Sequence, residues 1–102
     1  MTSPEVSIII PCLNEEKTIL SLLESILSQT FPVAGLEIVI ADGLSEDKTR
    51  QIIAEFQQKH PEMKIRVLDN PARRIPTGLN IAIRAAGGEI LTRMDAHAIP
   101  AA

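Results

Sequence analysis

Apolar residues occur along this chain in two alternating patterns. Short continuous aliphatic runs, which are typical of strands buried on both faces, lie at residues 6–11, 36–41, 64–68 and 89–94. Between these runs, apolar residues recur every three or four positions, as they do on the buried side of an amphipathic helix. The pattern therefore predicts four strands that alternate with three helices.

The three helical segments have recognisable ends. Asn14 and Ser45 are the expected N-caps of the first two helices, and Pro76 suits the first turn of the third. His60–Pro61 ends the second helix and Gly87–Gly88 ends the third. The residues expected to be buried are Ile19, Leu22, Leu23, Ile26 and Leu27 in the first helix, Thr49, Ile52, Ile53 and Phe56 in the second, and Leu79, Ala82, Ile83 and Ala86 in the third.

This order of elements predicts an α/β fold, in which right-handed crossovers build a parallel sheet with helices on both faces. No linker or repeat divides the chain, so we expect one domain. In such sheets ligands bind beyond the carboxyl ends of the strands. The segments that follow the predicted strands, and therefore form the expected site, are 11–15, 42–45, 70–74 and 95–97.

Most polar residues in these segments have an ordinary structural explanation when each is taken alone. Asn14 and Ser45 suit helix caps, and Asp42–Gly43 and Asn70–Pro71 suit turns. The triplet Asp95-Ala96-His97 is different, because a turn needs neither side chain there and both a carboxylate and an imidazole bind divalent metals. Such a triplet often arises by chance, so it is a weak indication of a metal site.

Composition narrows the choice of function. The 102 residues are 45% apolar and 23% charged, which is typical of a globular domain. The acidic pI near 5.3 and the presence of only two aromatic residues argue against a nucleic-acid partner. Five of the ten Lys and Arg residues are arginines within residues 66–93, where only two acids occur, and this favours a local anion site that includes Arg74. Cys12 is the single cysteine, and we interpret it as a buried residue rather than a nucleophile.

Several classes of site are disfavoured because their motifs are missing from the sequence. No G-x-G-x-x-G follows the first strand, and no G-x-x-x-x-G-K-[ST] occurs, which disfavours a dinucleotide fold and a P-loop.

The sequence contains neither about 18 consecutive apolar residues nor a signal peptide pattern. We therefore expect no membrane span and a cytoplasmic location, with the inner face of the membrane as a further option for the parent protein.

Four segments, in order, resemble the successive motifs of family 2 glycosyltransferases. They are Val6-Ser-Ile-Ile-Ile-Pro-Cys-Leu-Asn-Glu15, Ile38-Val-Ile-Ala-Asp-Gly-Leu-Ser-Glu-Asp-Lys-Thr49, Gly78-Leu-Asn-Ile-Ala-Ile-Arg-Ala-Ala-Gly-Gly-Glu89 and Arg93-Met-Asp-Ala-His97. The resemblance implies a GT-A fold with strand order 3-2-1-4 and an inverting hexosyltransferase in polysaccharide or glycolipid synthesis. It also implies a nucleoside-diphosphate sugar as donor, with a UDP-sugar expected, Mn²⁺ or Mg²⁺ as cofactor, and the hydroxyl of a saccharide or lipid-linked glycan as acceptor.

Carried over to this sequence, the resemblance implies two sets of site residues. The nucleotide-binding residues are Pro11, Leu13, Asn14, Glu15, Asp42, Arg74 and Asp95, and the metal ligands are Asp95 and His97. The chain departs from the family pattern at His97, which stands where D-x-D has its second Asp.

The length of the chain leads to a further expectation. Catalytic domains of this family are about twice as long or longer, so we expect residues 1–102 to be the nucleotide-binding half of such a domain, truncated after the D-x-D-like motif. The acceptor pocket and the catalytic base would then lie elsewhere, which leaves no catalytic residue to assign and predicts an inactive fragment. An uncovered sheet edge would favour a homodimer.

The alternative hypothesis is a non-catalytic, receiver-like regulatory module with an α/β fold. A receiver needs paired acids after its first strand, an Asp after its third and a Lys after its fifth. Glu15 and Glu16 fit the first requirement, but Asp69 is the only acid near the end of the third predicted strand and no fifth strand is predicted. Metal-enhanced binding of a nucleoside diphosphate would separate the two hypotheses.

Overall fold

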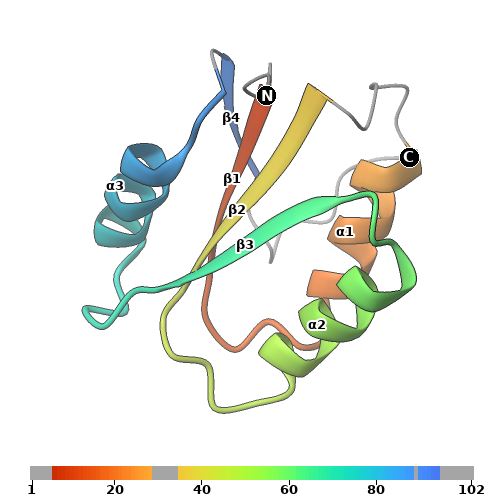
Figure 1. Cartoon of the computed structure of the whole chain (residues 1–102). Helices are drawn as coiled ribbons and strands as arrows, with labels where there is room; N and C mark the ends of the chain where they lie inside the picture. The colour runs from red at the N-terminus through yellow and green to blue at the C-terminus, as the bar shows by residue number, and fades with distance from the viewer. Residues whose placement is uncertain (1–5, 29–34, 89, 95–102) are drawn as a thin grey trace.

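The computed structural model describes residues 6–28, 35–88 and 90–94, and all seven predicted elements are present there (Figure 1). In chain order they are β1 (Val6–Cys12), α1 (Ile19–Ser28), β2 (Leu36–Asp42), α2 (Thr49–Lys59), β3 (Lys64–Asp69), α3 (Ile75–Ala85) and β4 (Ile90–Arg93).

The four strands form one parallel sheet in the order β3-β2-β1-β4, which confirms the predicted fold class and strand order. Cys12 pairs with Asp42, and Asp42 pairs with Asp69, so the last residues of β1, β2 and β3 lie side by side. The loops that follow these three strands therefore start from the same edge of the sheet.

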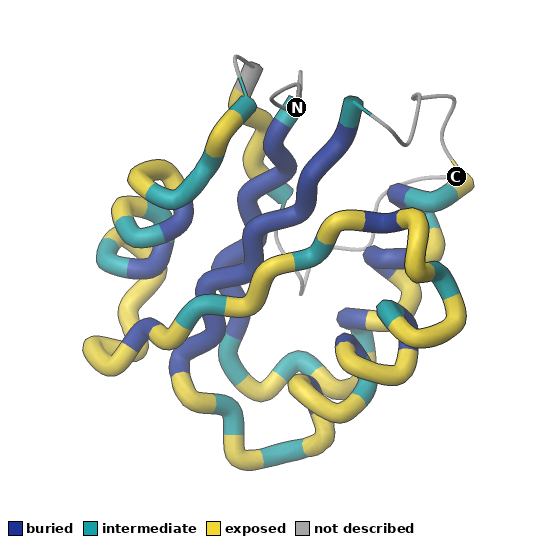
Figure 2. Tube along the Cα trace, viewed as in Figure 1, coloured by how far each residue is buried: buried dark blue, intermediate teal, exposed yellow. Residues whose placement is uncertain are grey.

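The helices cover both faces of the sheet, as predicted. Figure 1 shows α1 and α2 together on one side and α3 on the other. Because neighbouring side chains of a strand point to opposite faces, Ile8 and Ile10 of β1 pack beneath α1 and α2, whereas Ile9 packs against Ala82 of α3. The two central strands are consequently buried almost throughout, and edge strand β3 is largely exposed (Figure 2).

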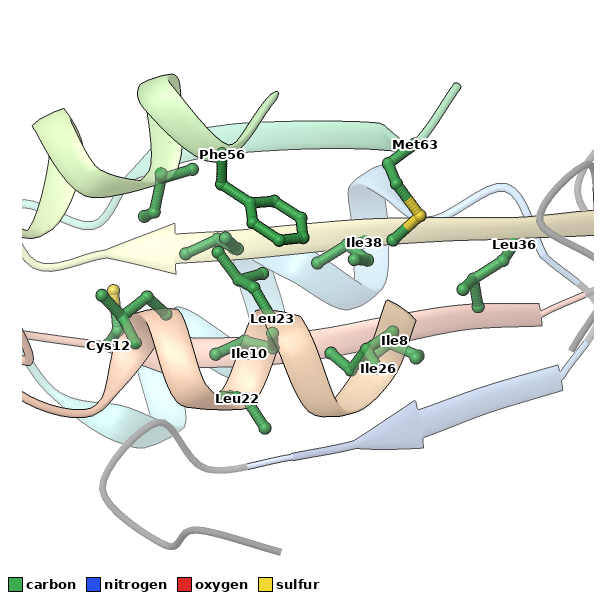
Figure 3. Close-up of a cluster of buried hydrophobic side chains, with 13 residues drawn as sticks. Ile8, Ile10, Cys12, Leu22, Leu23, Ile26, Leu36, Ile38, Phe56 and Met63 are labelled. Atoms are coloured by element: carbon green, nitrogen blue, oxygen red, sulfur yellow. The ribbon is translucent and has the colours of Figure 1, made fainter. Parts of the chain in front are cut away.

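The larger core lies beneath α1 and α2. Figure 3 shows Leu22, Leu23 and Ile26 of α1 over β1, with Phe56 of α2 and Met63 over β2. These five side chains are each at most 3% exposed. The apolar stripe that the sequence predicted for the first helix is therefore the surface that fixes α1 on the sheet.

The smaller core, beneath α3, differs from the prediction. The residues of α3 that are fully buried are Gly78 and Ala82, whereas Ile83 is 47% exposed. A Cβ atom on Gly78 would lie 3.4 Å from the Cβ of Ala41, so the helix backbone approaches the sheet closely along its smallest residues. This close approach turns Ile83 outward, which apolar spacing alone did not reveal.

The predicted caps of the first two helices are also wrong. Helix α1 begins at Ile19, well after Asn14, and the N-cap residue of α2 is Lys48 rather than Ser45. The Asn14 Oδ1 atom instead accepts a hydrogen bond from the backbone N–H of Glu46 at 2.8 Å. These side chains bond across to the neighbouring loop because the parallel pairing of β1 and β2 brings the two loops together.

Within the part of the chain that the structure describes, no helix has both the length and the apolar character needed to cross a membrane.

Candidate functional site

A pocket of about 280 Å³ lies at the carboxyl edge of the sheet. One wall comes from the end of β1 and the loop after it, and the other comes from the segment between β3 and α3. The residues that line it are Pro11, Cys12, Leu13, Glu15, Asn70, Arg73, Arg74 and Ile75. The structure thus brings Pro11, Leu13, Glu15 and Arg74, four of the predicted nucleotide-binding residues, to one pocket.

Asn70 lines this pocket, although its residue type predicts only a place in a turn. The side chain is 3% exposed, and its Nδ2 donates a hydrogen bond of 2.9 Å to the carbonyl oxygen of Arg74. Its buried Oδ1 atom has no hydrogen-bond partner, which is uncommon for a buried acceptor. The sequence signal was a polar amide directly after a predicted strand, at the edge where ligands bind.

Asp42 lies behind the pocket rather than in its lining. Its carboxylate is fully buried and accepts hydrogen bonds from the Ser45 N–H, the Ser45 hydroxyl, the Arg50 Nε and the Cys12 thiol, at 2.9, 2.5, 2.6 and 3.2 Å. Burial by itself raises the pKa of Asp42, but the hydrogen bonds from Ser45 and Arg50 outweigh it and hold the pKa below its ordinary value. The carboxylate is therefore ionised at neutral pH, with its oxygens already engaged.

The Cys12 thiol is buried beside Asp42 and donates a hydrogen bond to its Oδ1. Burial, followed by the hydrogen bond to the Asp42 carboxylate, raises the pKa of the thiol far above its ordinary value. A protonated thiol is a poor nucleophile, so the structure confirms the interpretation of Cys12 as a buried residue.

Left-handed backbone conformations occur in each of the three loops at this edge. Asn14, Leu44 and Arg73 have φ angles of 52°, 60° and 58°. Asn tolerates this region, but an L-residue such as Leu is disfavoured there by about 1–2 kcal/mol. Strained residues of this kind cluster at functional sites. Here Arg73 lines the pocket, and Asn14 lies between Leu13 and Glu15, which also line it.

The predicted metal ligands, Asp95 and His97, lie outside the described residues. Within residues 6–28, 35–88 and 90–94, no three His, Cys, Asp or Glu side chains come together as a group that could hold a metal ion. The metal site of the sequence analysis therefore stays a prediction.

The chain is thus a parallel α/β domain with a pocket at the carboxyl edge of its sheet. The chain belongs to glycosyl transferase family 2, whose family model matches residues 7–102. This match favours the first of the two hypotheses over a receiver-like module.

Two curated relatives illustrate the similarity in sequence. A dolichyl N-acetyl-alpha-D-glucosaminyl phosphate 3-beta-D-2,3-diacetamido-2,3-dideoxy-beta-D-glucuronosyltransferase of Methanococcus voltae is 41% identical over 95 residues, covering 93% of this chain and 30% of the relative. The succinoglycan biosynthesis protein ExoA of Rhizobium meliloti is 38% identical over 99 residues, covering 95% of this chain and 29% of the relative. The chain thus spans under a third of the length of these relatives.

Two solved structures illustrate the similarity in fold. The mannosyltransferase PcManGT from Pyrobaculum calidifontis, in complex with GDP-Man and Mn²⁺, matches with a TM-score of 0.89 and 32% identity, covering 99% of this chain and 30% of that one. Staphylococcus aureus TarS 1-349, in complex with UDP, matches with a TM-score of 0.82 and 30% identity, covering 90% of this chain and 27% of that one.

Proposed function

We propose that this protein acts in the transfer of a sugar from a nucleoside-diphosphate donor to an acceptor hydroxyl, in the synthesis of a polysaccharide or other glycan. The pocket between the ends of β1 and β3 would bind the nucleotide part of the donor. The observation that carries the proposal is that Pro11, Leu13, Glu15 and Arg74, named from sequence motifs, line one pocket at the edge where such folds bind ligands. The relatives named above, which are a glucuronosyltransferase, a mannosyltransferase bound to GDP-Man and a protein bound to UDP, support the same chemistry.

The size and lining of the pocket suit one part of such a donor. Its volume of about 280 Å³ is at the lower end of ligand pockets, which run from roughly 300 to 1,000 Å³. Pro11, Leu13 and Ile75 supply apolar surface, against which the flat face of a base can pack. The unpartnered Oδ1 of Asn70 is an acceptor that an N–H of a bound base can reach if the lining adjusts. We therefore assign the pocket to the nucleoside end of the donor.

Positive charge at the rim suits the diphosphate. Arg73 forms a 3.5 Å ion pair with Glu46, whereas Arg74 pairs with no carboxylate in the part of the chain that the structure describes. Helix α3 begins at Ile75, next to Arg74, and carries no acid in its first turn. A guanidinium beside the positive end of a helix dipole is a favourable position for phosphate oxygens.

Asp95 and His97 are the residues that would hold a divalent cation. In the sequence they come shortly after β4, which runs parallel to β1. When bound, the cation would neutralise charge on the diphosphate leaving group. Mn²⁺ is the ion in the PcManGT complex, and Mg²⁺ is the alternative that shares its preference for oxygen ligands.

Calorimetric titration of the 102-residue chain with UDP and with GDP, each with and without Mn²⁺, tests this proposal. We expect one of the two nucleotides to bind, and Arg74→Ala to weaken that binding about tenfold through loss of a charge-assisted hydrogen bond. Arg84→Ala removes an exposed arginine from the other end of α3 and serves as the matched control. Failure of both nucleotides to bind, or an equal loss in the two variants, would contradict the assignment of the pocket.

The metal assignment has its own test. Asp95→Asn should abolish any gain in nucleotide affinity on adding Mn²⁺. A full Mn²⁺ effect in that variant would show that the cation binds elsewhere.

A further inference from the structure

Three consecutive backbone N–H groups in the loop after β1 donate hydrogen bonds to side chains in the loop after β2 and at the first residue of α2. The Asn14 N–H donates to Ser45 Oγ at 2.8 Å, and the Glu15 N–H donates to Thr49 Oγ1 at 2.9 Å. The Glu16 N–H donates to the Asp47 carboxylate at 3.2 Å. Successive backbone N–H groups of the loop after β1 thus find their acceptors on side chains about thirty residues further along the chain.

The direction of the two hydroxyl groups is determined by carboxylates. Ser45 donates its proton to Asp42 Oδ1, and Thr49 donates its proton to Asp47 Oδ1, both at 2.5 Å. A hydroxyl has one proton and two lone pairs, so a hydroxyl that donates to a carboxylate turns its lone pairs toward other donors. Each hydroxyl is therefore oriented to receive an N–H group of the loop after β1.

These side chains are anchored to regular structure. Asp42 is the last residue of β2 and is held by Arg50 of α2, while Thr49 is fully buried at the start of α2. The backbone N–H of Thr49 also donates to Asp47 at 2.9 Å. The loop after β1 is therefore shaped against a rigid support.

The supporting side chains and the pocket-lining side chains are different residues. Ser45, Asp47 and Thr49 do not line the pocket, whereas Leu13 and Glu15, which flank and include the bonded N–H groups, do. A substitution at Ser45, Asp47 or Thr49 would therefore displace one wall of the pocket without removing any pocket-lining atom.

We propose that Ser45, Asp47 and Thr49, with Asp42 behind Ser45, are positioning residues that determine the nucleotide affinity of the pocket by shaping the loop at residues 13–16. This inference rests on the proposed function for its ligand. It gives Asp42 a role that acts through Ser45, since the Asp42 carboxylate is fully buried and its oxygens already accept four hydrogen bonds.

Hydrogen exchange of single backbone amides, followed by NMR on the nucleotide-free chain, tests the support directly. Ser45→Ala should accelerate exchange at Asn14, and Thr49→Val should accelerate it at Glu15, each by at least about tenfold, because each amide loses its acceptor. Thr49→Ser retains the hydroxyl and should restore protection. Ser21→Ala removes an exposed hydroxyl from α1 and is the matched control.

Titration of the same variants with UDP and GDP tests the consequence for binding. Ser45→Ala and Thr49→Val should weaken binding of whichever nucleotide the unmodified chain binds by about tenfold, with Thr49→Ser and Ser21→Ala within about twofold. Asp47→Asn, at a partly exposed position, provides the same test if Thr49→Val does not fold, and should accelerate exchange at Glu16.

The possible failures are distinguishable. Unchanged exchange at residues 14–16 in Ser45→Ala and Thr49→Val would overturn the positioning role, whatever the titrations show. Faster exchange with unchanged affinity would overturn the link between the loop and the pocket. If the unmodified chain binds neither UDP nor GDP, the proposed function fails and the claim about affinity fails with it, while the exchange rates still decide whether the support exists.

Discussion

Two buried carboxylates lie at opposite ends of β2 and have similar partners. Asp42, at the carboxyl end, accepts hydrogen bonds from a serine hydroxyl and from Arg50. Glu37, at the amino end and on the opposite face, accepts a hydrogen bond of 2.6 Å from the Ser7 hydroxyl and one of 3.2 Å from Arg66. The same combination of acid, hydroxyl and guanidinium is therefore used twice in one strand.

The Asp42 network and the Glu37 network contact different parts of the molecule. Glu37 also accepts a hydrogen bond of 2.6 Å from the Gly87 N–H, and Ser7 accepts one of 2.8 Å from the Gly88 N–H. Arg66 donates as well to the carbonyl oxygen of Ala85, the last residue of α3. The Glu37 network thus ties the connection between α3 and β4 to the sheet, far from the pocket, whereas the Asp42 network shapes a wall of the pocket. Identical chemistry serves the fold at one end of the strand and the site at the other.

The largest expected effect is on the free energy of unfolding, and it comes from the Glu37 network at the amino end of β2. Glu37→Ala leaves the Gly87 N–H and the Ser7 hydroxyl without the acceptor they share, removes the carboxylate that pairs with Arg66, and should lower the free energy of unfolding by about 3 kcal/mol. Urea denaturation measures this loss. Under conditions where the variant is folded, its nucleotide affinity should equal that of the unmodified chain. A matching loss of affinity would show that the two networks are not separate.

Asp42→Asn should have a smaller effect on stability and a larger effect on binding. An amide places N–H donors where Ser45 and Arg50 also donate, which should cost about 2 kcal/mol of unfolding free energy. Nucleotide affinity should fall about tenfold, because Ser45 loses the group that orients it. Denaturation and calorimetry on the same sample separate the two quantities, and unchanged affinity would contradict the role given to Asp42.

A pair of glycine substitutions sharpens the contrast. A Cβ atom on Gly88 would lie 2.6 Å from Ser7 Oγ and 2.7 Å from the Ser7 backbone nitrogen, so Gly88→Ala should cost about 2 kcal/mol with no change in affinity. A Cβ atom on Gly78 would lie 2.8 Å from Asn70 Nδ2, so Gly78→Ala should cost about 1 kcal/mol and weaken nucleotide binding by displacing Asn70. If the two variants change nucleotide affinity equally, the conclusion that only the carboxyl end of the sheet affects binding would be wrong.

The smallest expected effect is on the dependence of stability on pH. Burial acts to raise the pKa of Glu37, as it does for Asp42, but the hydrogen bonds from Ser7 and the Gly87 N–H outweigh it and leave the pKa lowered. Carboxylates with a lowered folded pKa stabilise the native state above their ordinary values of 4.5 for Glu37 and 3.8 for Asp42, and this contribution is lost as the pH falls through the folded values.

Denaturation between pH 7 and pH 3 should therefore show stability falling as the pH drops below about 4.5. Glu37→Gln should remove the part that begins at the higher pH, and Asp42→Asn the part that begins at the lower pH. A profile that neither substitution alters would show that other carboxylates dominate the acid sensitivity.

Sequence alone was sufficient for the features that depend on local periodicity. The alternation of aliphatic runs with helical spacing identified all seven elements, and the motif resemblance supplied the strand order that the structure confirms. Because parallel strands end at one edge, the sequence also indicated the edge at which the pocket lies, and Pro11, Leu13, Glu15 and Arg74, which the motif resemblance named, line that pocket. The elements could be predicted because burial on one or both faces produces a regular spacing of apolar residues along the chain.

Only the tertiary structure decided the partners of the polar side chains. Asn14 and Ser45 have the residue types of helix caps, and locally a cap is the best use of them, but each bonds instead to a loop about thirty residues away. Asn70 opens the turn that its residue type predicts, with its carbonyl oxygen accepting a hydrogen bond of 3.0 Å from the Arg73 N–H, but only the packing of α3 near Gly78 buries its side chain at the pocket. A polar group bonds to whichever partner the fold brings within about 3 Å, and that distance depends on strand pairing and helix packing, which no single segment of the sequence contains.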